Sequence, residues 1–154
     1  MGKNMNKHFL DAVHQGNYHK AKKLIRDMPH NQLCQFLIDL AIETGSIAIY
    51  TFTCFLLLEQ ESAELHYCAA GILDHGLCYL KGATSSSFFH AKRAVELSPN
   101  DITCQQELLY YFGMPDQVLS KEEAKTIAEN ILLKDPDNVE ALEVIKEISK
   151  NSGA

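Results

Sequence analysis

The sequence predicts an all-α fold in which antiparallel helical hairpins pack side by side. Apolar residues recur at helical spacing along most of the 154 residues, as they do in helices that bury one face. Only four prolines and eight glycines interrupt the chain, and every proline falls between two periodic stretches. Because proline breaks a helix interior, this placement predicts helices joined by short turns.

Nine helices are expected from the apolar spacing. Their approximate spans are 4–14, 17–28, 31–43, 46–59, 62–81, 86–97, 101–112, 120–134 and 138–150. The polar segment 82–87 is expected to be a linker between two of them.

The residues at the predicted helix ends agree with these spans. Four glycines follow a periodic stretch, where a helix end favours a residue with positive φ: Gly16, Gly45, Gly82 and Gly113. Two pairs have the spacing of a capping box at a helix start: Ser120 with Glu123, and Asp137 with Glu140.

The most apolar segment runs from Ile47 to Leu58 and carries no charge. Its twelve residues are too few to span a bilayer, so a buried central helix is expected. A β-strand is the alternative, because Ile, Tyr, Phe and Thr favour strands. If its apolar surface stays uncovered, the segment could instead form a homodimer contact of a self-associating scaffold.

Composition limits the class of protein. With 46% hydrophobic and 22% charged residues, the chain is expected to fold as one helical domain over residues 1–150, followed by a disordered tail at 151–154. The net charge of −6, without a run of basic residues, argues against a nucleic-acid partner and favours a basic protein.

The five cysteines are odd in number and form no CxxC pair. They are therefore expected to be reduced and buried, which indicates a cytoplasmic protein with no membrane association. The polar start, Met1 to Lys7, lacks the apolar core of a signal peptide.

Two segments repeat one another and carry a family resemblance. Residues 94–101 (AVELSPND) and 131–138 (ILLKDPDN) each resemble the end of a tetratricopeptide repeat, with prolines 37 residues apart against a family period of about 34. Residues 15–21 (QGNYHKA) resemble the turn between the two helices of such a repeat. The resemblance covers roughly the first 30 and the last 65 residues, and residues 31–80 match no repeat. It implies a short tetratricopeptide-like α-solenoid.

The resemblance also implies a function and a site. Tetratricopeptide proteins hold a partner protein in a groove lined by the first helix of each repeat. Carried onto this sequence, the groove residues are Thr103, Gln106, Tyr110, Glu140, Glu143 and Glu147. The three glutamates form one stripe, which is also what a solvated terminal helix would show. A polar outer face commonly caps such a stack.

The chain is therefore expected to bind a partner protein, with no enzymatic activity and no cofactor. One version is a small bacterial immunity or inhibitor protein that neutralises a basic toxin. An adaptor or chaperone-like protein fits the same features. No nucleophile elbow, Walker loop, GxGxxG or HExxH motif is present.

A metal- or small-molecule-binding protein centred on the predicted helix 62–81 is the alternative. Cys68, His75 and Cys78 would share one broad face of that helix, with His66 pointing away and His90 able to approach across a turn. Zinc needs four convergent ligands, and the spacing matches no common zinc motif. A bound metal is therefore not expected.

Overall fold

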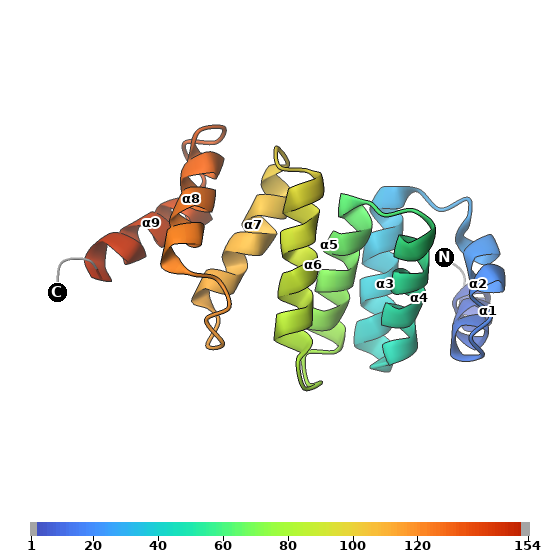
Figure 1. Cartoon of the computed structure of the whole chain (residues 1–154). Coiled ribbons are helices and arrows are strands. Elements are labelled where there is room, and N and C mark those ends of the chain that lie inside the picture. The colour runs from blue at the N-terminus through green and yellow to red at the C-terminus, as the bar shows by residue number, and fades with distance from the viewer. Residues whose placement is uncertain (1–2, 152–154) are drawn as a thin grey trace.

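The computed structural model describes residues 3–151, and within them nine α-helices follow one another in an elongated row (Figure 1). The helices are α1 (Lys3–His14), α2 (Tyr18–Ile25), α3 (His30–Thr44), α4 (Ile47–Glu59), α5 (Ala63–Gly71), α6 (Ala83–Leu97), α7 (Ile102–Tyr110), α8 (Lys121–Leu132) and α9 (Val139–Asn151). Helices α1 and α9 lie at opposite ends of the row. The all-α prediction with nine helices packed on their neighbours is confirmed.

Most of the predicted helix ends are confirmed. Ser120 and Glu123 form the expected capping box at the start of α8, and Gly16 and Gly45 follow α1 and α3 with positive φ. Gly82 also has positive φ, but it precedes α6 and does not end a helix. Of the predicted tail, Asn151 belongs to α9, and residues 152–154 lie outside the described residues.

Two predictions at helix ends are wrong. Gly113 closes a short 3-10 turn, η2 (Tyr111–Gly113), without positive φ, and Gln117 in the following loop has a φ of 47° instead. The predicted capping box of Asp137 is replaced by Asn138, whose side-chain oxygen accepts the N–H of Ala141 at 3.2 Å.

The single helix predicted over 62–81 is also wrong. Helix α5 ends at Gly71, and a π-helical turn, η1 (Ile72–Gly76), follows it directly. The N–H of Leu77 closes this turn by donating to the carbonyl of Ile72 at 3.0 Å. A π turn commonly marks a functional site, because it redirects the side chains on it. The predicted linker 82–87 is mostly helical, since α6 already begins at Ala83.

The described residues form two large hydrophobic cores and a small third cluster of Ala63, Ala94 and Cys104. In the N-terminal core, the ring of Phe52 on α4 meets those of Phe9 and Tyr18 edge-on at centroid distances of 5.3 and 5.8 Å. The segment 47–58 is therefore a helix and not a strand, although Ile47 and Leu58 are exposed. Whether it mediates self-association stays a prediction.

The C-terminal core packs α6, α7, α8 and α9 around Tyr111, which is fully buried. Small residues on α8 and α9, Ala124, Ala128 and Ala141, are also fully buried and allow the helices to approach closely. Adjacent Tyr110 is exposed, and its ring meets the buried ring of Tyr111 edge-on at a centroid distance of 5.8 Å. Tyr111 thus anchors this core and, through its hydroxyl, the site described below.

The cysteine prediction holds in part. All five are free, and Cys68 and Cys104 are buried, but Cys78 is exposed and Cys34 and Cys54 are half-buried. Across residues 3–151, none of the helices combines the length and the apolar character that a bilayer crossing would require.

Candidate functional site

A recess of about 340 Å³ opens between α5, η1, α7 and α9. Its lining residues are Tyr67 on α5, His75 on η1, Thr103, Gln106, Glu107 and Tyr110 on α7, and Glu140 on α9. The α7 residues follow the spacing i, i+3, i+4, i+7, so they form one stripe of that helix. Four separate elements therefore contribute polar or aromatic side chains to one concave surface.

Glu107 is the charged group set deepest in this recess. Its side chain is half-buried, and burial together with the charge of Asp74 raises the pKa of its carboxyl group, against a smaller opposing effect of His75. Asp74 in turn accepts a hydrogen bond from the hydroxyl of the buried Tyr111. That bond and burial raise the pKa of Tyr111, so the phenol stays protonated and holds Asp74 in place.

The rim of the recess joins two helices. The side-chain amide of Gln106 donates to the carboxylate of Glu140 at 3.4 Å, which links α7 to α9. Because the side chain of Asn138 caps α9, the carboxylate of Glu140 is not needed as a cap and can accept the hydrogen bond from Gln106.

Four of the six predicted partner-contact residues therefore lie together. Thr103, Gln106, Tyr110 and Glu140 share the lining of the recess. Glu143 and Glu147 are exposed farther along α9 and are not among its lining residues. The predicted stripe on α9 is thus a surface that starts at the recess and continues away from it.

Sequence reasoning missed three lining residues. Glu107 could have been found, because it lies between Thr103 and Tyr110 on the same helical stripe. His75 could not, because it lies in the π turn that follows Gly71. Tyr67 could not, because it enters the recess only through the packing of α5 beside α7. His75 was considered only as a metal ligand.

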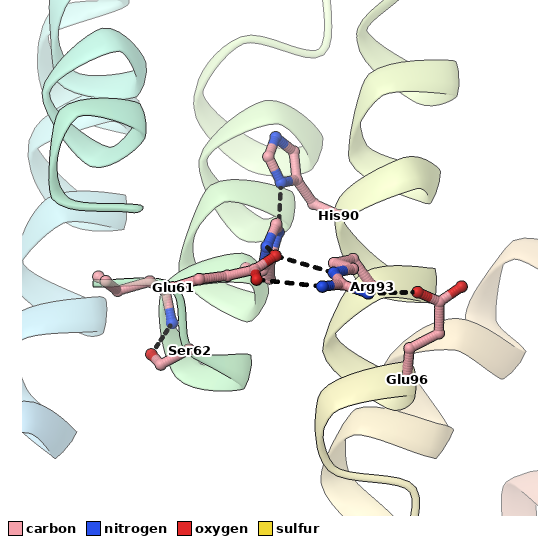
Figure 2. A network of polar contacts seen from close by, with 7 residues as sticks. Glu61, Ser62, His90, Arg93 and Glu96 are labelled. Carbon is pink, nitrogen blue, oxygen red and sulfur yellow. Dashed lines mark hydrogen bonds and ion pairs between the residues drawn. The ribbon is translucent and has the colours of Figure 1, made fainter. Parts of the chain in front are cut away.

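A second polar cluster crosses from Tyr50 on α4 to His90 and Arg93 on α6. Figure 2 shows its part around Glu61, His90 and Arg93. The buried rings of His66 and His90 meet at 2.8 Å between their Nδ1 atoms, and His90 Nε2 lies 2.9 Å from the hydroxyl of Tyr50. Glu61 lies 3.1 Å from His66 Nε2 and receives two hydrogen bonds from Arg93, at 2.8 and 3.0 Å. This cluster ties three successive helices and the loop before α5 together.

Burial and the neighbouring imidazole lower the pKa of His90 to about 4, so at neutral pH its ring is uncharged. Two Nδ1 atoms at hydrogen-bond distance share one proton, and a second proton would leave two donors facing each other. Hydrogen bonds from Arg93 and His66 lower the pKa of Glu61 to about 2. None of the residues in this second cluster lines the recess between α5, η1, α7 and α9. We therefore assign the cluster of His66, His90 and Glu61 a structural role.

The metal alternative receives no geometric support. Across residues 3–151, no group of three or more His, Cys, Asp or Glu side chains is placed to hold a metal ion. Cys68 is buried against the carbonyl of Cys34 at 3.9 Å, whereas His75 and Cys78 are exposed. The three candidate ligands therefore do not share the face that a continuous helix would have given them.

When the chain is compared with protein-family models, curated proteins and solved structures, nothing matches it.

Proposed function

We propose that this chain is a protein-binding module whose partner docks on the surface formed by α5, α7 and α9. One observation carries the proposal: residues from four separate elements converge on the recess. Four of these residues, Thr103, Gln106, Tyr110 and Glu140, are the ones that the sequence predicts at a partner groove. Convergent polar and aromatic side chains around a concavity are the usual features of a binding site.

The order of the helices supports a repeat-type groove. The three helices that line the recess are alternate ones, α5, α7 and α9. In a tetratricopeptide-like solenoid, the first helices of successive pairs line the concave face in this way. We extend the proposal to such a solenoid on this ground and on the two proline-ended repeats.

Charge supports a basic partner. Glu107 and Glu140 line the recess, Glu143 and Glu147 continue the acidic stripe, and the whole chain carries −6. Opposite charge speeds the encounter of two proteins and disfavours acidic competitors. Exposed Tyr110 adds a large ring at low entropic cost, as interface anchors commonly do.

The concrete version that we favour is an immunity or inhibitor protein that blocks a basic toxin, and an adaptor role is the alternative. Both require a partner protein and no chemistry by the chain itself. They differ in what the partner does once it is bound, so identification of the partner separates them.

The proposal predicts that the triple variant Glu140→Lys, Glu143→Lys, Glu147→Lys loses at least tenfold in partner affinity, because it places three positive charges against a basic surface. Partners would be captured from the native cell on the wild-type chain, identified, and their affinity for the purified variant measured by calorimetry. Circular dichroism should report an unchanged helical content.

The matched control is a triple variant with the same change in charge at Glu43, Glu122 and Glu129, which are exposed on α3 and α8. It should keep affinity within about twofold of the wild type, apart from a small loss of long-range attraction. Equal losses in both triple variants, or none in either, would reject this surface as the docking site.

A further inference from the structure

We propose that the recess between α5, η1, α7 and α9 receives a single arginine side chain from the partner protein. This inference rests on the proposed function and names the chemistry of its central contact. It follows from the charge, the walls and the size of the recess.

The first ground is charge without a counterion. Among the described residues that line the recess there is neither lysine nor arginine, although Glu107 and Glu140 are both present. Glu107 is half-buried and lies in the field of Asp74, whose own carboxylate is engaged by Tyr111. A cation entering the recess would therefore meet an acidic group that has no lysine or arginine among the lining residues. Partly buried ion pairs are worth more than solvent-exposed ones.

Elsewhere in the described chain, several carboxylates do have such partners. Glu59 pairs with Lys22 at 2.7 Å, Glu61 with Arg93 at 2.8 Å, and Glu123 with Lys92 at 3.2 Å. Glu107 is different because the groups that affect it are another acid and a histidine. The recess thus differs from these three ion-paired sites, because its half-buried carboxylate has neither lysine nor arginine among the lining residues.

The walls favour a guanidinium over a compact cation. The rings of Tyr67 and Tyr110 both line the recess, and a planar guanidinium stacks on aromatic faces. Its forked donors can serve a carboxylate and a side-chain oxygen together, and Gln106, Thr103 and Glu140 supply acceptors beside Glu107. An ammonium or a hydrated metal ion would use the charge but would gain less from the two rings.

The size of the recess is sufficient for one arginine side chain. At about 340 Å³, the recess lies at the lower end of the range for small-ligand pockets, roughly 300 to 1,000 Å³. Its mouth adjoins the exposed stripe of Glu143 and Glu147, where the rest of a basic protein would lie. The partner would therefore insert one arginine and spread its other basic residues along α9.

The test is a titration of the whole ¹⁵N-labelled chain with N-acetyl-arginine-N-methylamide, followed by NMR. We expect saturable shifts at Tyr67, Gln106, Glu107 and Tyr110, with a dissociation constant in the millimolar range. The neutral isostere N-acetyl-citrulline-N-methylamide should bind at least fivefold more weakly, and the lysine analogue should bind more weakly than arginine.

Glu107→Gln should weaken arginine binding about tenfold, because it removes one charge and keeps the shape of the side chain. Glu43→Gln, the same change on an exposed residue of α3, should leave the affinity unchanged. Equal binding of arginine and citrulline, binding unaffected by Glu107→Gln, or no saturable shift in the recess would overturn the inference.

Failure of this inference is distinguishable from failure of the proposed function. If the triple lysine variant loses its partner while Glu107→Gln does not, the surface on α9 binds the partner but the recess takes no arginine. If neither change affects partner binding, both ideas are wrong.

Discussion

A Gly76→Ala variant is expected to lose about 3 kcal/mol of unfolding free energy, at the upper end of the usual cost of overpacking. A Cβ atom at Gly76 would lie 2.6 Å from the Cβ of Ala41 and 2.7 Å from its backbone carbonyl carbon. Backbone cannot move aside as the end of a long side chain can, so α3 and η1 must separate. Urea denaturation followed by circular dichroism measures the loss.

Gly113→Ala is the matched control, because nothing lies within 4 Å of its would-be Cβ and its φ is not positive. Its stability should stay within about 0.5 kcal/mol of the wild type. Since η1 carries Asp74 and His75, Gly76→Ala should also disturb the recess before the protein unfolds. A Gly76→Ala variant as stable as Gly113→Ala would show that α3 and η1 do not pack as closely as described.

Acidification from pH 7 to pH 4 is expected to remove about 2 to 3 kcal/mol of unfolding free energy through His90 alone. Burial and His66 lower the pKa of His90 from 6.5 to about 4. Between these values the unfolded chain binds more protons than the folded one. Stability from this group is therefore complete above pH 6.5 and is lost as the pH falls toward 4.

His90→Gln isolates this contribution, because glutamine retains hydrogen-bonding capacity but does not titrate. Its unfolding free energy should change less than that of the wild type over the same pH range, by about 2 kcal/mol, when both are measured in urea. Glu61 acts at lower pH: its lowered pKa of about 2 means that its contribution is lost only below about pH 4.5. Parallel pH profiles for wild type and His90→Gln would contradict the buried, neutral state of His90.

Local signals in the sequence predict the helices but not how they meet. Apolar spacing predicts α1 through α9 because each helix buries one stripe, and the Ser120–Glu123 capping box is complete within four residues. The π turn depends on the close contact of Gly76 with Ala41, which lies 35 residues away in sequence. The apolar spacing within residues 62–81 does not predict the contact between Gly76 and Ala41, because Ala41 lies outside that segment.

The residues of the recess also divide into those that helical spacing predicts and those that only the packing of the helices brings together. Thr103, Gln106 and Tyr110 lie on one helical stripe, and the same spacing should have added Glu107. Tyr67 and His75 enter the recess because of how α5 and η1 pack against α7. Likewise, His66 and His90 are 24 residues apart and become partners only through the packing of α5 on α6.

The most direct measurement of the central claim is the ¹³C chemical shift of the Glu107 carboxyl group, followed over a pH titration. If the recess holds a half-buried carboxylate beside Asp74, the pKa of Glu107 should lie above the ordinary value of a glutamate side chain. It should then fall when N-acetyl-arginine-N-methylamide is added to saturation. A Glu107 pKa at the ordinary value of a glutamate side chain, and unchanged by the arginine compound, would contradict the account.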